Sequence, residues 1–305
     1  MGRLEGFVAG VLAAGLVACG TSAPPPDPVT VSTATIPRAT PGATLIRPTA
    51  APAASASPEP AVVRPPRAAS ANTPTALAAA LVAAEQTIRD ARAGPGALAA
   101  AGHEQQIAYR RLVRRQRWRA PVLARLPAAL RPAARRNIAA GERLYELVTP
   151  QPKLPDWRIR RPAPAAELRR HYRRAGNRFA IPWQYLAAIH LVETRMGRIR
   201  GTSTAGAQGP MQFLPATWAV YGRGDINDNG DAIMAAARYL SANGAPQDMR
   251  RALWRYNHSD RYVDAISAYA RTMVAEPRTY RGYYHWQVYY LTVDGDALLP
   301  VGYGR

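Results

Sequence analysis

The chain has 305 residues, with 40 basic against 20 acidic side chains and a formal net charge of +20. This charge predicts attraction to polyanions such as nucleic acid, anionic lipid headgroups or acidic cell-wall polymers, and does not choose between them. The single cysteine, Cys19, excludes a disulfide within the chain, so the folded part must rely on its hydrophobic core.

The N-terminus has the pattern of an export signal. Arg3 provides a positive start, and residues 6–18 form an apolar run that is too short to span a bilayer but suits a signal peptide. The run ends in Leu-Val-Ala-Cys-Gly, which resembles the lipobox of bacterial lipoproteins. That resemblance implies cleavage of residues 1–18 and lipidation of Cys19. The protein would then be extracytoplasmic, anchored in the bacterial cell membrane and facing the cell wall. Ordinary signal cleavage beside an incidental cysteine is the alternative.

Residues 19–74 are dominated by Pro, Ala, Ser and Thr, with hardly any large apolar side chain. Such a segment cannot bury enough surface to offset the entropy of ordering it. We therefore predict a disordered tether.

Residues 75–150 are predicted to be helical. Thr73 and Pro74 look like a cap and a first-turn proline ahead of an Ala/Leu-rich helix over residues 76–93. The Gly-Pro-Gly sequence after it breaks that helix, which resumes over residues 97–118. Pro132 is expected to open a further helix that runs to Leu147.

This helical region carries a cluster of six arginines within residues 110–119: Arg110, Arg111, Arg114, Arg115, Arg117 and Arg119. One interpretation is a patch for anionic wall polymer or lipid, and the other is an ordinary solvated helix face. The charge pattern does not decide between them.

After a Pro-rich linker, residues 156–305 are of a size that predicts one further domain. A helix is expected over residues 181–198, with Pro182 in its first turn and Gly197 at its C-terminal end. Glu193 falls on the same face as Leu186, Ile189 or His190, and Met196, which are apolar or weakly polar. A carboxyl in such a stripe would be desolvated, which raises its pKa. Helix geometry alone favours the alternative of a surface glutamate paired with Arg195 or Arg198.

Residues 203–213 form a turn with two glycines among small and amide-bearing side chains, followed by a helix from Leu214 that ends near Gly222. Glycine allows a close backbone approach to a ligand. Ser203, Gln208 and Gln212 supply the neutral donors and acceptors that suit sugar hydroxyls and acetamido groups.

In combination these motifs are specific. Glu193-Thr194, Ser203, the Gly-Ala-Gln-Gly-Pro-Met-Gln-Phe-Leu-Pro run at 206–215, Ala-Ala-Arg-Tyr-Leu at 236–240 and the Tyr256-Asn257 pair resemble the soluble lytic transglycosylase domain in order and spacing. The resemblance covers about residues 165–270 and looks closest to the membrane-bound lytic transglycosylase B-like enzymes of high-GC Gram-positive bacteria. His258 and Ser259 stand where that family usually has small residues, a departure that concerns the shape of a subsite rather than the reaction.

The resemblance implies a mainly α, lysozyme-like catalytic domain with a single catalytic carboxylate, Glu193, and no cofactor. Peptidoglycan glycan strands would be the substrate, contacted by Ser203, Gln208, Met211, Gln212, Tyr256 and Asn257. Glu193 would first protonate the glycosidic oxygen and then take a proton from the 6-hydroxyl of the muramic acid, closing a 1,6-anhydro ring. Tyr256 and Asn257 are plausible donors around the substrate's acetamido group or Glu193.

Two further segments leave alternatives open. The loop of Asp225, Asn227 and Asn229 begins like a calcium-binding EF-hand loop but has Ala236 at the last ligand position, so a polar turn with Asp231 as a helix cap is the favoured interpretation. The aromatic segment 283–292, followed by an Asp-Gly turn, predicts a C-terminal strand or hairpin. Its aromatic residues would form either a packed cap, which is favoured, or a wall for stacking sugars.

The alternatives to a transglycosylase are a muramidase, whose second carboxylate would be one of the domain's aspartates, and a peptidoglycan-binding protein without catalysis. Asp225, Asp228, Asp231, Asp260 and Asp264 are the aspartates in question. Nucleic acid is not an expected partner, because the export signal places the protein on the other side of the membrane and no nucleic-acid motif accompanies the positive charge.

Overall fold

A computed structural model describes residues 70–304 of the chain. The predicted signal peptide, the lipidation site at Cys19 and residues 19–69 of the predicted tether lie outside the described residues. The last residues assigned to the tether belong to the folded part, because Ala71 is 5% exposed and Thr73 caps a helix.

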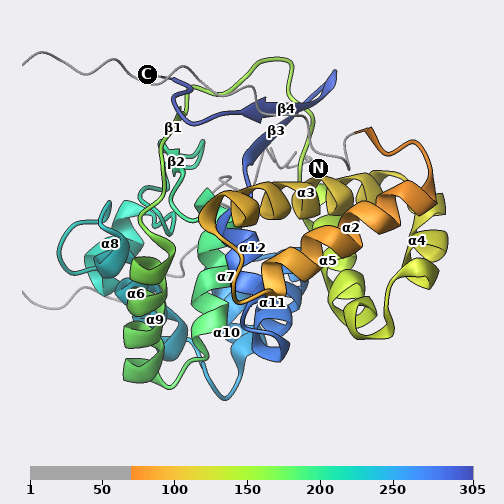
Figure 1. Cartoon of the computed structure of the whole chain (residues 1–305). Coiled ribbons are helices and arrows are strands. Elements are labelled where there is room, and N and C mark those ends of the chain that lie inside the picture. The colour runs from red at the N-terminus through yellow and green to blue at the C-terminus, as the bar shows by residue number, and fades with distance from the viewer. Residues whose placement is uncertain (1–69, 305) are drawn as a thin grey trace, which may run out of the picture. The chain divides into compact units, whose positions relative to one another are not determined.

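The described residues are mainly helical, as predicted, and Figure 1 shows how the helices are arranged. The α-helices are α2 (Pro74–Arg89), α3 (Pro95–Arg114), α4 (Arg119–Arg125), α5 (Arg131–Tyr145), α6 (Ala165–Phe179), α7 (Trp183–Thr194), α8 (Pro215–Tyr221), α9 (Asn229–Ala242), α10 (Met249–Tyr256), α11 (Asp260–Ala275) and α12 (Thr279–Tyr284). Two short 3₁₀ turns, η1 (Gln116–Trp118) and η2 (Ala128–Leu130), flank α4. No helix among residues 70–304 has the length and apolar character needed to cross a membrane.

Two antiparallel pairs of strands complete the described fold. The pair β1 (Arg158–Ile159) and β2 (Ile199–Arg200) places Arg158 opposite Arg200. The C-terminal hairpin predicted from the sequence is confirmed as β3 (Val288–Thr292) and β4 (Gly295–Leu299). Gly295 has a φ of 115°, which a side chain would disfavour.

The N-terminal helices form where local signals predict them. The Thr73 hydroxyl accepts a hydrogen bond from the amide of Ala76 at 3.1 Å, so the cap is confirmed. The helices are separate, as predicted, but the break lies earlier: α2 ends at Arg89, Gly94 is the N-cap of α3, and Pro95 and Gly96 form the first turn of α3. Pro132 lies in the first turn of α5, as expected.

The N-terminal helices and the C-terminal half of the chain share one core. The described residues belong to a single compact unit, in which α5 packs on α11, and α3 packs on both α5 and α12. The 75–150 region and the 156–305 region, predicted as separate parts of the sequence, are therefore packed together. Figure 1 shows α7 between the helices α6 and α9 on one side and α5 and α11 on the other.

A buried polar network joins the two regions. Glu85 on α2 is 2% exposed, pairs with Arg89, and accepts hydrogen bonds from Gln105 at 3.0 Å and from Tyr109 at 2.5 Å. Gln105 in turn accepts one from the indole of Trp286 at 2.9 Å. These bonds satisfy polar groups that would be costly to bury unpaired.

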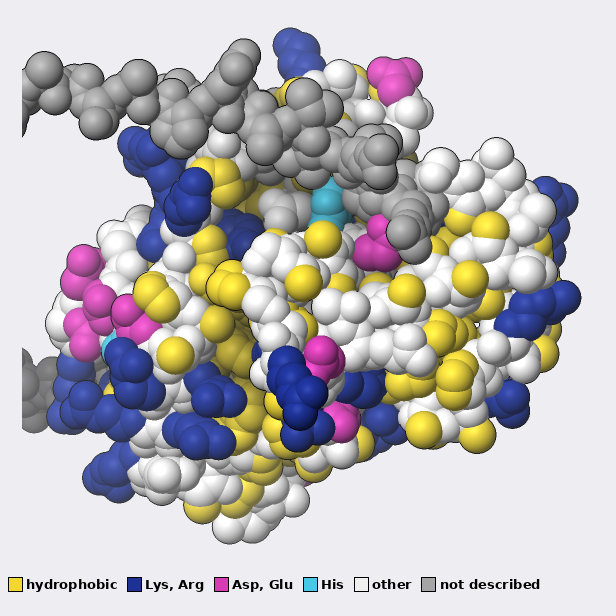
Figure 2. Space-filling model, viewed as in Figure 1, with side chains coloured by type: hydrophobic (Ala, Val, Ile, Leu, Met, Phe, Trp, Pro, Cys, Tyr) yellow, Lys and Arg dark blue, Asp and Glu magenta, His cyan; other side chains and the backbone are white. Residues whose placement is uncertain are grey.

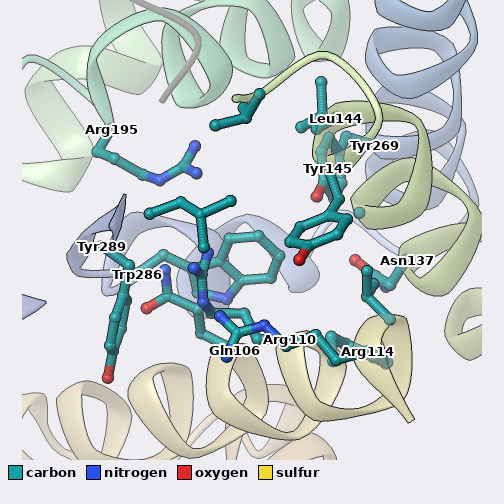
Figure 3. Close-up of a pocket in the computed structure, with 15 residues that line it drawn as sticks. Gln106, Arg110, Arg114, Asn137, Leu144, Tyr145, Arg195, Tyr269, Trp286 and Tyr289 are labelled. Atoms are coloured by element: carbon teal, nitrogen blue, oxygen red, sulfur yellow. The ribbon is translucent and has the colours of Figure 1, made fainter. Parts of the chain in front are cut away.

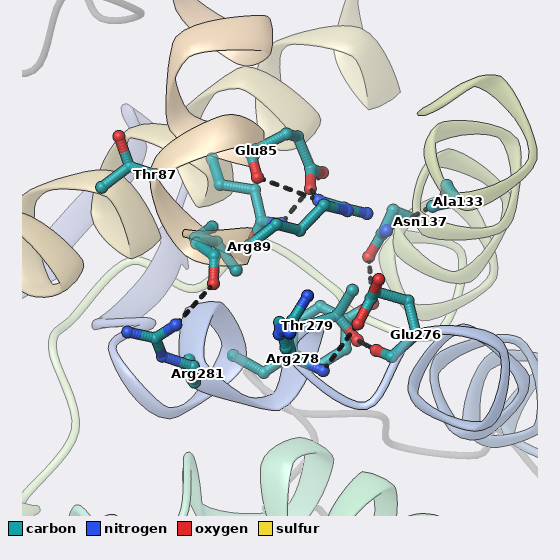
Figure 4. Close-up of polar contacts among 12 residues, drawn as sticks. Glu85, Thr87, Arg89, Ala133, Asn137, Glu276, Arg278, Thr279 and Arg281 are labelled. Atoms are coloured by element: carbon teal, nitrogen blue, oxygen red, sulfur yellow. Dashed lines mark hydrogen bonds and ion pairs between the residues drawn. The ribbon is translucent and has the colours of Figure 1, made fainter. Parts of the chain in front are cut away.

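Arg281 makes a second connection between the regions, shown in Figure 4. From α12 its guanidinium donates to the carbonyl oxygens of Ile88 at 3.3 Å, Asp90 at 2.7 Å and Ala93 at 3.2 Å. These are carbonyls at and beyond the C-terminal end of α2, where a positive charge is favoured.

Candidate active site

The helix that carries Glu193 is buried on all sides. Every residue from Leu186 to Thr194 is buried, so the single apolar stripe expected from the sequence is replaced by a helix in the middle of the core. It also differs from the predicted bounds of 181–198, because Pro182 is its N-cap and it ends at Thr194. Arg195 and Met196 take left-handed φ values of 54° and 61° ahead of Gly197, and this terminates the helix.

Glu193 is 5% exposed, and its carboxyl accepts a hydrogen bond from the hydroxyl of Tyr262 at 2.7 Å. Burial raises the pKa of Glu193 to about 8, although the bond from Tyr262 acts in the opposite direction. The carboxyl is therefore protonated at neutral pH. The alternative of a surface glutamate paired with Arg195 or Arg198 is wrong.

The turn over residues 203–213 is held by its own hydrogen bonds. The backbones of Gln208 and Phe213 pair with each other at 2.8 and 2.9 Å, and the Ser203 hydroxyl accepts from the amide of Ala207 at 3.0 Å. Gly209 has a φ of 73°, and a Cβ there would lie 2.0 Å from the carbonyl oxygen of Ile226. Only glycine fits this close approach.

Two side chains attach this turn to the neighbouring helices. Thr194, the residue after Glu193, donates from its hydroxyl to the carbonyl oxygen of Pro210 at 2.7 Å. Tyr256, at the end of α10, donates to the carbonyl oxygen of Met211 at 2.6 Å. The folded chain thereby brings together Glu193, the turn and Tyr256, which are widely separated in the sequence.

Two amide oxygens near these residues have no partner. The Oε1 atom of Gln212 and the Oδ1 atom of Asn257 are buried and make no hydrogen bond with any described residue. Gln212 is also held in a left-handed conformation, with a φ of 52°, and its amide nitrogen donates to the carbonyl of Gly209 at 3.0 Å. Buried acceptors of this kind are normally satisfied, so a ligand donor is a natural partner for each.

The other predicted contact residues have different positions. The side chain of Met211 is fully buried in the core, so only its backbone is available near the turn. Gln208 lines a polar groove of about 650 Å³ with Gly209, Arg158, Arg160 and Arg200. The groove begins at the turn and continues along the β1–β2 pair.

Tyr262, the hydrogen-bond partner of Glu193, was not predicted from the sequence as a site residue. It lies on α11, whose buried face includes Tyr262, Ile266, Tyr269 and Met273 at intervals of three and four residues. A tyrosine in such a stripe brings a hydroxyl into the core, and a buried hydroxyl needs a hydrogen-bond partner. This requirement was the signal in the sequence that could have pointed to Tyr262. Ser259, one of the two departures from the family pattern, caps this helix through the amide of Tyr262 at 3.4 Å.

The aspartates considered as a second catalytic carboxylate make structural contacts instead. Asp260 and Asp264 form ion pairs with Arg250, and Asp264 is 42% exposed. Glu85 and Glu193 are the two buried carboxyl groups among residues 70–304, and Glu85 belongs to the network between α2, α3 and the C-terminal half.

The loop of Asp225, Asn227 and Asn229 is a polar turn. The carboxylate of Asp225 accepts from the amide of Asn227 at 2.8 Å, and the Oδ1 atom of Asn229 is buried without a hydrogen-bond partner among the described residues. Asp228, rather than the predicted Asp231, caps α9, and Asp231 accepts from the amide of Asp225 at 3.0 Å. Residues 70–304 contain no group of three His, Cys, Asp or Glu side chains placed to hold a metal ion.

The arginine cluster predicted within residues 110–119 is partly engaged in contacts inside the protein. Arg110 and Arg114 both pair with Asp296 on β4, and Arg119 pairs with Glu142. Arg111 and Arg115 lie over the ring of Trp118, so most of the predicted cluster has internal partners. A more exposed basic face lies on α6, which sequence reasoning did not single out. Its exposed arginines are Arg169, Arg170, Arg173, Arg174 and Arg178. Figure 2 shows Lys and Arg side chains gathered on the side of the molecule where α6 lies.

The aromatic residues near the C-terminus form part of the core. Tyr283 is fully buried and Trp286 is 5% exposed, and their rings lie edge to face with centroids 5.1 Å apart. The packed cap was therefore the correct interpretation for these two residues.

Comparison with models of known protein families, with curated proteins and with solved structures finds no match to this chain.

Proposed function

We propose that the protein is a lytic transglycosylase that cleaves the glycan strands of peptidoglycan, with Glu193 as its acid and base. The observation that carries the proposal is the buried carboxyl of Glu193 with a pKa of about 8, held by Tyr262 beside the 203–213 turn. A general acid needs a proton to give at neutral pH, and burial supplies that condition.

The geometry supports different roles for the two oxygens of the Glu193 carboxyl. Because Oε1 accepts the hydrogen bond from Tyr262, the acidic proton is carried by Oε2, which faces the glycosidic oxygen of the substrate in our proposal. Proton transfer leaves a carboxylate that Tyr262 stabilises. That carboxylate then removes the proton of the muramic acid 6-hydroxyl as the hydroxyl oxygen bonds to C1, forming the 1,6-anhydro ring.

The surrounding residues support sugar binding. The unpaired oxygens of Gln212 and Asn257 accept from hydroxyl or acetamido N–H groups of the glycan. Ser203 and Gln208 add neutral donors, and the groove lined by Arg158, Arg160 and Arg200 offers a path for a negatively charged strand. The lysozyme-like fold, the lipid anchor at Cys19 and the cell-wall location are parts of the same proposal.

Digestion of purified peptidoglycan tests the proposal, with the new chain ends identified by mass spectrometry. We expect anhydro-muramic acid ends from the wild-type protein and none from Glu193→Gln, which should still bind glycan. A matched control is Glu142→Gln, a partly exposed glutamate on α5 that pairs with Arg119, and it should cut normally. Reducing ends would instead identify a muramidase, and binding without new ends would leave a non-catalytic glycan-binding protein.

A further inference from the structure

A cavity of about 90 Å³ lies between α3, α5, α11 and the hairpin strand β3, apart from the Glu193 site (Figure 3). Its walls are largely apolar and aromatic, with Leu144, Tyr269, Trp286 and Tyr289 among them. A volume of this size is several times what one water molecule needs, and it suits a small organic molecule. Glu193 does not line it.

Arg195 points its guanidinium into this cavity, as Figure 3 shows. The residue is 7% exposed and donates from Nη1 to the carbonyl oxygen of Leu191 at 2.6 Å. Its Nε atom has no partner among the described residues, and no aspartate or glutamate lines the cavity. A buried cation without a counter-ion is costly, so this arrangement is incomplete as it stands.

Two more arginines add positive charge to the cavity. Arg110 and Arg114 also line it, and they share one carboxylate, Asp296. Three guanidinium groups are therefore offset by a single acidic side chain. The surplus charge favours an anion in the cavity.

An outer cleft adjoins the cavity. A second hollow of about 330 Å³ shares Arg110, Arg114 and Tyr289 with the cavity, and its further charged lining consists of Arg111, Arg115 and Asp296. Its four arginines outnumber the single aspartate, so the cleft adds to the positive potential that favours an anion in the neighbouring cavity.

We propose that the cavity is a binding site for a small organic carboxylate with a short apolar body. The carboxylate accepts paired hydrogen bonds from the fork of Arg195, and the apolar body lies against Leu144, Tyr269 and Trp286. The site stands apart from the catalytic centre, and the inference does not depend on the proposed transglycosylase activity.

Butyrate is a suitable probe, titrated into the full-length protein at constant ionic strength and followed by isothermal calorimetry. Butyramide is its neutral counterpart of nearly the same shape. We expect saturable one-to-one binding of butyrate, with butyramide at least about 10-fold weaker because it lacks the charge that Arg195 pairs with.

Two variants assign the binding to the guanidinium. Arg195→Met keeps the length of the side chain, and removal of an unpaired buried charge is tolerated by many folds. We expect it to weaken butyrate binding at least about 30-fold, and Arg195→Lys, which keeps the charge but not the fork, to be intermediate. Arg198→Met is the matched control, because Arg198 is 5% exposed, also has unpaired Nε and Nη1 atoms, and does not line the cavity.

The possible outcomes are distinct. Wild-type affinity in Arg198→Met together with the loss in Arg195→Met supports the proposal. The absence of butyrate binding, equal binding of butyramide, undiminished binding in Arg195→Met or an equal loss in Arg198→Met would each overturn it.

Discussion

The hydroxyl of Tyr262 donates a hydrogen bond to the carboxyl of Glu193 at 2.7 Å, and both residues are buried. Burial of Glu193 raises its pKa, whereas this bond lowers it, so the value of about 8 is the balance of two opposing effects. Tyr262 thus has two consequences for Glu193: it orients one oxygen and it limits how far the pKa rises.

Tyr262→Phe should move the alkaline limb of the pH–activity profile upward. Wild-type cleavage should fall above about pH 8, where Glu193 loses its proton. Without the Tyr262 bond the pKa of Glu193 rises further, and activity should drop about 10-fold because the carboxyl is less well oriented. Initial rates of glycan cleavage between pH 5 and 10 measure both effects.

Tyr256→Phe is the matched control for that measurement. Its hydroxyl bonds the carbonyl oxygen of Met211 rather than Glu193. We expect lower activity, because the turn loses an attachment, but the alkaline limb should stay where it is in the wild type. An equal movement in both variants would contradict a specific role for Tyr262.

Glu193→Gln should make the protein more stable than the wild type at high pH. The pKa of Glu193 is about 8 in the folded protein against an ordinary value of 4.5, so the folded state holds a proton that the unfolded state releases. The resulting stabilisation of the wild type is complete below about pH 4.5, decreases as pH rises, and is lost above about pH 8.

Glutamine does not titrate, so its advantage over glutamate should grow by about 3–5 kcal/mol between pH 4 and pH 9. Urea unfolding of both proteins at these two pH values gives the comparison. A difference between them that is the same at both pH values would mean that Glu193 has an ordinary pKa.

Gly209→Ala should disrupt the turn beside Glu193 more than Gly206→Ala. Both glycines have positive φ values, 73° and 83°, but a Cβ at Gly209 meets the backbone carbonyl of Ile226 at 2.0 Å whereas a Cβ at Gly206 meets nothing within 4 Å. We expect Gly206→Ala to cost about 1–2 kcal/mol of unfolding free energy for its conformation alone. Gly209→Ala should cost at least about 2 kcal/mol more because of the clash. Equal costs would show that the turn can relax at Ile226.

Glu85→Ala should destabilise the whole described unit. The substitution leaves Arg89, Gln105 and Tyr109 without their shared acceptor, which we expect to cost about 3–5 kcal/mol. Because α2 and α3 share a core with α5, α11 and α12, unfolding should remain one transition, with tryptophan fluorescence and far-ultraviolet circular dichroism coincident. Two separate transitions would indicate that the N-terminal helices unfold on their own.

Local sequence signals predicted where several elements begin and turn. Thr73 and Pro74 start α2, Gly94 and Pro95 start α3, and the Asp-Gly turn closes the β3–β4 hairpin. These features depend on caps, fixed φ values and glycine conformations, which act between near neighbours in the chain and can therefore be read from it.

The burial and pKa of Glu193 follow from contacts that become visible in the folded protein. Helical periodicity placed Glu193 on an apolar stripe but could not show that α7 is enclosed on all sides. Nor could it show that the left-handed end of the helix begins at Arg195 rather than Gly197, or that Tyr262 donates a hydrogen bond to Glu193. It also could not show that Arg110 pairs with Asp296, far along the chain, while Arg195 has no acidic partner in its cavity. Burial, pKa and charge pairing depend on contacts between distant segments, because desolvation and Coulomb interactions follow distance in space rather than separation in sequence.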